Sequence, residues 1–157
     1  MGDHRETPHS GLKILLILGA MLGLGGFAFW KLGQVEEEAG RLAAEVVEPH
    51  LEAVRAEEWD AARQLASAAW QERWAEGTLA AAYDALVEEH GPLERWERRA
   101  TNEVQRAGEA FHRIQYVLHF ARGRAHVAFD VVAEGEGPRI HASYRYTVDG
   151  SLEPVPR

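Results

Sequence analysis

The chain contains no cysteine, and this absence excludes several kinds of chemistry at once. Disulfide frameworks, cysteine nucleophiles, thiolate zinc sites and cysteine-linked lipid anchors all need a sulfur that the sequence does not have. Lysine is nearly absent as well, because none follows Lys31. Beyond that point positive charge comes only from arginines scattered among acids, a pattern typical of solvated faces.

The sequence also lacks an excess of positive charge. Its formal net charge is -8 at pH 7, and almost all of its acidic residues follow Lys31. A field of this sign repels phosphate, so we expect no nucleic acid partner and no close adsorption of the domain onto anionic headgroups. We predict no cofactor.

One long apolar run interrupts this charged sequence, between Lys13 and Lys31. As a helix it spans about 25 Å, against a hydrocarbon core of about 30 Å, and the lysine stems can reach the two interfaces. An aromatic group ending at Trp30 lies where an interfacial belt is expected. We therefore predict an N-terminal tail at residues 1–13 and a transmembrane anchor at residues 14–31.

A cleaved secretory signal is the alternative for this run, because basic residues precede it. The small-x-small cleavage triplet near its end is Gly26-Phe27-Ala28, and the bulky Phe29 and Trp30 follow at once, so we favour a retained anchor. The span has equal numbers of basic residues on its two sides, so basic charge alone does not set the orientation. The acidic residues at 36–38 favour an orientation with the domain outside the cytoplasm. We therefore predict a single-pass protein of the cell membrane with this orientation.

Helical spacing of apolar residues marks the first half of the domain, which we place at residues 34–152. A glycine and a proline after His90 supply a stop in the order typical of a helix end, and Thr78 can cap the helix that this stop ends. Three helices are predicted: one over Val35–Ala56 with a kink or break at Pro49, one over Trp59–Trp74, and one from Thr78 to His90.

After Pro92 the period of the pattern changes from 3.6 to 2. Apolar residues alternate up to Phe120 and again after a tight turn at Arg122-Gly123, and a further turn at 135–138 leads into a last strand that ends near Tyr146. We expect the tail 153–157 to be extended and loose. The prediction is an α+β domain with about three helices packed on a curved antiparallel sheet of about four strands.

Pairing the apolar residues of these strands sorts every side chain onto one of two faces. The Arg122-Gly123 turn places Leu118 opposite Val127 and Tyr116 opposite Phe129, and the next turn places Val131 opposite Ile140 and Phe129 opposite Ala142. The opposite face then gathers His119 beside His126, and Asp130 beside His141. These four residues are weak candidates for a metal site, and solvated side chains on a wet sheet face are the interpretation that we favour.

The face toward the helices offers a ligand pocket instead. It contains no carboxylate or imidazole among the residues assigned to it, which argues against proton-transfer catalysis, so no catalytic residue is predicted. A plain hydrophobic core is the alternative interpretation of this aromatic set. The predicted pocket residues are Trp59, Trp70, Trp96, Tyr116, Phe129, Tyr144 and Tyr146.

Two stretches of sequence resemble the nuclear-transport-factor-2-like superfamily, whose members have a cystatin-like, cone-shaped α+β fold. His50 to Ala62 looks like the helix, small turn, aromatic and helix that open such domains, and Glu89 to Leu93 looks like their entry into the sheet. The resemblance covers most of residues 39–150 and implies helices packed over a curved sheet. Members include isomerases, dehydratases and ligand-binding modules, but the family's catalytic Asp and His have no convincing equivalents in the pocket set. In architecture the chain is also similar to membrane-tethered cytochrome oxidase assembly factors.

The function predicted from the sequence is that of a membrane-anchored, non-enzymatic accessory domain for protein interaction or for binding a small apolar ligand. Two alternatives stay open: a cryptic enzyme of the ketosteroid-isomerase-like kind, using the histidines and Asp130, and an assembly factor for a membrane complex. The membrane is the expected partner. A second copy of the chain, paired through the outer sheet face, or another membrane protein is left open as a further partner.

Overall fold

The computed structural model describes residues 30–31, 33–73, 77–147 and 151–155. The chain divides into two units, Met1–Glu36 and Glu37–Arg157, whereas the sequence placed the start of the domain at residue 34. The predicted tail, and all of the predicted anchor except Trp30 and Lys31, lie outside the described residues. Within the described residues, no helix is both long and apolar enough to cross a membrane.

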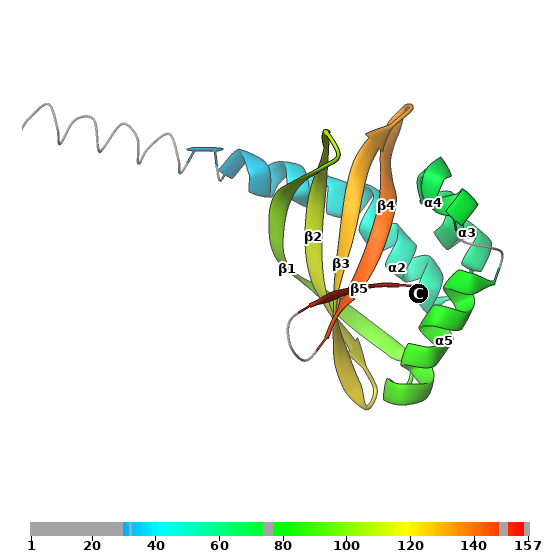
Figure 1. Ribbon diagram of the computed structural model, residues 1–157. Coiled ribbons are helices and arrows are strands. Elements are labelled where there is room, and N and C mark those ends of the chain that lie inside the picture. Colours follow the sequence, from blue (N-terminus) through cyan, green and yellow to red (C-terminus); the bar gives the residue numbers. More distant parts are fainter. Residues whose placement is uncertain (1–29, 32, 74–76, 148–150, 156–157) are drawn as a thin grey trace, which may run out of the picture. The chain divides into compact units, whose positions relative to one another are not determined.

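The second unit is an α+β domain in which helices precede an antiparallel sheet, as the sequence predicted. The sheet has five strands, each paired with the next along the chain, in the order β1-β2-β3-β4-β5 (Figure 1). The predicted count of about four was too low because Leu152–Pro154, whose last two residues were expected in a loose tail, pairs with β4. The elements are η1 (Ala43–Val47), α2 (Glu48–Arg55), α3 (Trp59–Gln64), α4 (Ala68–Arg73), α5 (Thr78–His90), β1 (Leu93–Arg106), β2 (Glu109–Phe120), β3 (Gly123–Glu134), β4 (Gly137–Tyr146) and β5 (Leu152–Pro154).

The first helix of this unit does not break at Pro49. Residues 37–42 are helical and continue through the π-helical segment η1 into α2. Pro49 has no N–H group to give to the preceding turn, and the irregularity lies just before it, where the Glu48 N–H bonds to the Ala43 carbonyl five residues back. Helix α2 therefore has the proline in its first turn, where a helix does not need that N–H group for its own hydrogen bonds.

The predicted second helix is two short ones. Between α3 and α4 the chain turns aside and pairs with β4: the Ser67 N–H donates to the Ile140 carbonyl at 2.8 Å, and the Ile140 N–H donates to the Leu65 carbonyl at 3.0 Å. The Ser67 hydroxyl then accepts the Trp70 N–H at 3.2 Å, as an N-cap does. A serine within an otherwise helical pattern was the available signal for this break.

Helix α5 has nearly the predicted bounds. Its cap is not Thr78, because Gly77 occupies that position with φ of 85° and Thr78 is already helical. Its end is as predicted: Gly91 has φ of 84°, and its N–H bonds to the Val87 carbonyl at 2.7 Å. This end positions the β2–β3 turn, since the Arg122 N–H bonds to the His90 carbonyl at 2.7 Å.

The β2–β3 turn is formed by Ala121 and Arg122, one residue earlier than predicted. Gly123 belongs to β3 and pairs with Phe120, so Leu118 lies opposite Ala125 and Tyr116 opposite Val127. The shift moves each pairing by two residues, and because side chains alternate with a period of two, every side chain of this hairpin keeps its predicted face. The buried core residues of the hairpin are Ile114, Tyr116, Leu118, Phe120, Ala125, Val127, Phe129 and Val131.

The β3–β4 pairing contains a bulge that the sequence did not reveal. Val131 lies opposite Ile140 as predicted, but Asp130 lies opposite Ala142 and Phe129 opposite Ser143. The extra residue on β4 reverses the faces of all that follows, so Tyr144 and Tyr146 point away from the helices. Their predicted place on the helix-covered face is therefore wrong.

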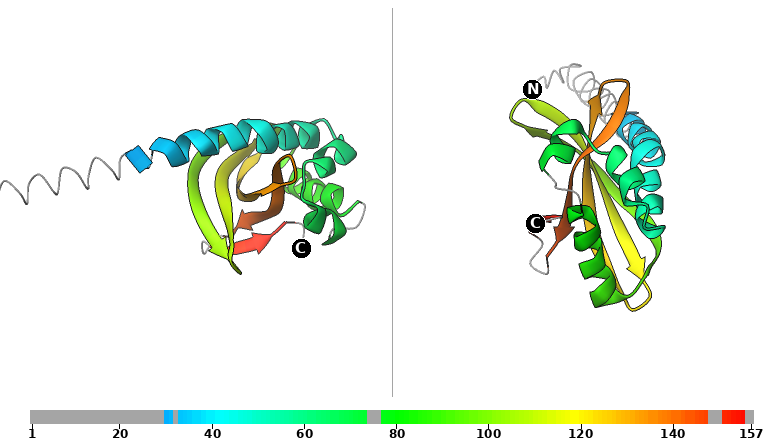
Figure 2. Two further views of the ribbon diagram at one scale, coloured as in Figure 1. Left: turned by 90° about the horizontal axis from the view of Figure 1, so that it is seen from above. Right: turned by 90° about the vertical axis from the view of Figure 1, so that its right-hand side faces the viewer.

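Helix α2 lies along the buried face of the sheet, and α3, α4 and α5 lie together beyond β4 (Figures 1 and 2). Val46, Val47, Leu51 and Val54 on the first helix meet Leu79 and Leu86 of α5 and the sheet in one hydrophobic cluster. Ala62 of α3 and Trp70 of α4 belong to the same cluster, and a cavity forms where these two helices meet α5.

Candidate functional site

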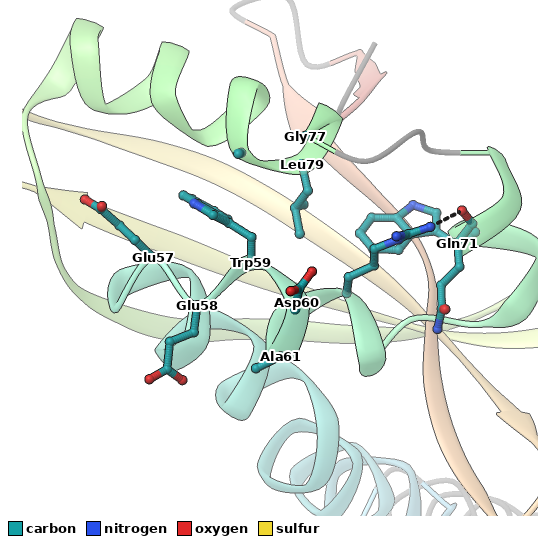
Figure 3. Close-up of a pocket in the computed structure, with 11 residues that line it drawn as sticks. Glu57, Glu58, Trp59, Asp60, Ala61, Gln71, Gly77 and Leu79 are labelled. Carbon is teal, nitrogen blue, oxygen red and sulfur yellow. Dashed lines mark hydrogen bonds between the residues drawn. The ribbon is translucent and has the colours of Figure 1, made fainter.

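A cavity of about 610 Å³ lies where α3, α4 and the first turn of α5 meet. Trp59, Trp70 and Leu79 give it an apolar wall. Charged residues line it as well, and Figure 3 shows Glu57 and Asp60 on the two sides of Trp59. The volume and the apolar lining are those of a small-molecule site. Among the described residues, the lining is formed by Glu57, Glu58, Trp59, Asp60, Ala61, Arg63, Trp70, Gln71, Gly77, Leu79 and Ala80.

Local structure positions both indole rings beside the cavity. Glu57 has a positive φ of 58°, an uncommon conformation for a residue with a side chain, and it turns the chain so that α3 begins at Trp59. The Trp59 ring packs against Tyr83 of α5, with the ring centroids 6.4 Å apart. Trp70 is buried, and the Ser67 cap holds the helix that carries it.

Polar groups lie around the apolar wall. The Asp60 carboxylate lies on the Leu79 side of Trp59, whereas Glu58 points away from the indole (Figure 3). Arg63 also lines the cavity, and its Nη2 donates to the Gln71 carbonyl at 3.2 Å. The arrangement is suited to holding an apolar body inside and leaving charges at the opening.

Behind this cavity, between α2 and the sheet, lies a fully buried histidine, His50. Its ring is surrounded by the rings of Phe129 at 5.8 Å, Trp70 at 6.2 Å and Tyr83 at 6.3 Å between centroids. Nδ1 lies 3.0 Å from the Ala62 carbonyl oxygen, which can only accept a hydrogen bond. Burial lowers the pKa of His50 to about 4, against the opposing effect of that carbonyl, so the ring is neutral at pH 7.

His50 was not predicted from the sequence, because only strand residues and aromatic residues were assigned to the helix-covered face. The signal was present: Val46, His50 and Val54 follow one another at intervals of four, so the histidine belongs to the apolar stripe of its helix. An imidazole at such a position is buried with the stripe.

The structure separates the seven predicted pocket residues into four places. Trp59 and Trp70 line the cavity, while Tyr116 and Phe129 are buried in the core with their rings 6.0 Å apart. Trp96 packs at the edge of the core, with the Arg55 guanidinium 5.3 Å from its ring. Tyr144 and Tyr146 lie on the opposite face of the sheet.

That opposite face is not simply wet. Asp130 is buried there and receives two hydrogen bonds from Arg113, at 2.6 and 2.8 Å. The same guanidinium lies 5.0 Å from the Tyr144 ring, whose hydroxyl accepts a hydrogen bond from Arg106 at 3.1 Å. Asp130 is thus occupied by an arginine, and this pair raises the pKa of Arg113.

The three histidines predicted on this face are dispersed over it. His126 lies opposite Val117 rather than beside His119, because of the shifted turn. His119 Nε2 is 3.7 Å from Glu97, and His141 packs on Phe111 with Nδ1 3.3 Å from the Ser67 hydroxyl. In the described part of the chain, no group of three or more His, Asp or Glu side chains is placed to hold a metal ion.

Comparison with known proteins adds no relative to this description. No protein-family model matches the chain, and searches of curated proteins and of solved structures found no match to it.

Proposed function

We propose that this chain is a membrane-anchored, non-enzymatic module whose domain binds a small apolar molecule at the membrane surface. The observation that carries the proposal is the cavity of about 610 Å³ with Trp59, Trp70 and Leu79 in its wall. Large aromatic side chains normally fill the space between them, so an open volume between two indoles is suited to a ligand.

The ligand test compares a cavity-filling variant with a matched variant on the same helix. Ala80 lines the cavity, whereas Val87 is exposed on α5 outside it. The probe is 5-fluoro-1-methylindole, and its binding to the full-length chain in nanodiscs is followed by ¹⁹F NMR against empty nanodiscs. We expect Ala80→Phe to weaken binding by about tenfold or more, equivalent to about 1.4 kcal/mol, and Val87→Phe to bind like the wild type. Equal binding by all three proteins would contradict the proposal.

The anchored location is supported by the uncharged run between Lys13 and Lys31 and by the aromatic group at its end. The proposed orientation places the domain outside the cytoplasm. A C-terminal fusion to alkaline phosphatase, which folds only outside the cytoplasm, is expected to be active and to sediment with membranes. Activity from a cytoplasm-only reporter at the same end would reverse the orientation.

Kinship with the nuclear-transport-factor-2-like superfamily is part of the proposal. It is supported by the order of helices followed by a meandering antiparallel sheet, with α2 along one face. The cavity lies to one side of this layer, between α3, α4 and α5.

A proton-transfer enzyme is a second candidate, and one observation favours it: His50 is a neutral imidazole held by a backbone carbonyl. Unlike the candidates from the strands, it lies beneath the helices. The enzyme would exchange an acidic C–H hydrogen of its substrate with deuterated water, and the variant His50→Gln would not. The absence of such exchange with simple cyclic ketones at neutral pH would rule this candidate out.

A further inference from the structure

We infer that His50 is the polar anchor of the ligand. The ligand is a neutral, mostly apolar molecule with one hydrogen-bond donor, a hydroxyl or N–H group, which bonds to Nε2 of His50 while the apolar body lies against Trp59 and Trp70. This inference rests on the proposed function of the cavity and names the chemistry of what it binds.

The protonation of His50 follows from its one hydrogen bond. Because the Ala62 carbonyl can only accept, Nδ1 carries the proton, and in the neutral ring Nε2 is left with a bare lone pair. This nitrogen is buried, and no protein group among the described residues bonds to it. A buried acceptor without a donor destabilises the folded chain, and a ligand donor would remove that penalty.

The imidazole lies one side chain behind the cavity wall. Trp70 both lines the cavity and packs edge-on against His50, and Tyr83, which also contacts His50, packs against Trp59. Leu79 and Tyr83 are four residues apart and share a face of α5, so the cavity and the imidazole adjoin the same helix face. Binding to Nε2 requires the Trp70 ring to move aside, because this ring separates His50 from the cavity.

These surroundings select the ligand. A carboxylate or carbonyl oxygen would be repelled by Nε2, because both atoms present lone pairs. An ammonium ion would lose its hydration among the rings of Phe129, Trp70 and Tyr83, which is unfavourable. A neutral donor group can bond to this lone pair, and it can be buried among the apolar rings at a lower cost than a charged group. The site therefore discriminates between ligands with and without this donor, because a ligand that lacks it leaves Nε2 unpaired and binds more weakly.

The experiment compares 5-fluoroindole with 5-fluoro-1-methylindole, which differ in the N–H donor. Binding of both to the full-length chain in nanodiscs is measured by ¹⁹F NMR. We expect the wild type to bind 5-fluoroindole about tenfold more tightly once partition into empty nanodiscs is subtracted, which is the effect of one buried hydrogen bond. His50→Leu should bind both probes equally, and His119→Leu, on the opposite face, should keep the wild-type preference.

A second measurement does not depend on the folding of a variant. In ¹⁵N-labelled wild type, the resonance of the bare His50 Nε2 should shift when 5-fluoroindole is added and stay in place with 5-fluoro-1-methylindole. Equal affinity of the wild type for both probes, or a resonance that neither probe moves, would overturn the assignment of His50. If the methylated probe still binds and Ala80→Phe weakens it, the proposed function stands without that assignment.

Discussion

At the residue scale, the burial of His50 makes the stability of the domain depend on pH. The pKa of this group is about 4 in the folded state and about 6.5 when solvated, so the unfolded chain binds more protons between these values. The contribution of the buried neutral ring to the free energy of unfolding is fully present above pH 6.5 and is lost as the pH falls toward 4. We expect the free energy of unfolding to drop by about 3 kcal/mol over that interval, measured by urea denaturation. In His50→Gln this drop should largely disappear, and an unchanged pH profile in the variant would contradict the assignment.

A second residue, Gly123, is required by close approach rather than by its backbone conformation. A Cβ atom at this position would lie 2.8 Å from Nδ1 of His90, whose ring also packs on Phe120. We expect Gly123→Ala to lower the free energy of unfolding by about 1–3 kcal/mol, as overpacking does. Gly137→Ala is the control, because nothing lies within 4 Å of its added Cβ, and it should be close to neutral. Equal effects of the two substitutions would refute this explanation.

At the element scale, the pair Arg113–Asp130 ties β2 to β3 on the face away from the helices. Both side chains are largely buried, with 12% and 5% of their surface exposed. Replacing Arg113 with Met leaves a buried carboxylate without its partner, and we expect a loss of about 3–5 kcal/mol in the free energy of unfolding. Adding Asp130→Leu should recover much of that loss. Arg124→Met, an exposed control on β3, should change stability by about 0.5 kcal/mol or less, and a similar effect at both arginines would contradict the role of the pair.

The order of the helices and strands could be predicted from the sequence, but one detail of their pairing could not. The change from a period of 3.6 to a period of 2 after Pro92 placed helices before strands, and the core face of the β2–β3 hairpin followed from alternation alone. The bulge opposite Asp130 could not be predicted, because Ser143, Tyr144 and Arg145 have no polarity pattern that marks an inserted residue. That one residue carried Tyr144 and Tyr146 to the other face.

At the scale of the whole domain, the candidate site could be predicted only in part. Trp59 and Trp70 were found because large aromatic residues at helical spacing face inward. The cavity itself depends on the break at Ser67, which is stabilised by pairing with Ile140, more than seventy residues later in the chain. Such a contact is non-local and leaves no local pattern in the sequence. His50 was missed for a different reason, since a single histidine in an apolar stripe carries no motif.

The central claim is that a small apolar molecule occupies the space between Trp59, Trp70 and Leu79. The most direct measurement is a crystal structure of the chain soaked with 5-iodoindole, in which the anomalous signal of iodine locates the probe. The account predicts an iodine peak inside this cavity in the wild type and none there in Ala80→Phe. It would be contradicted by a cavity without iodine while a peak appears elsewhere, for example in the groove of Ala81, Ala85 and Pro154 between α5 and β5.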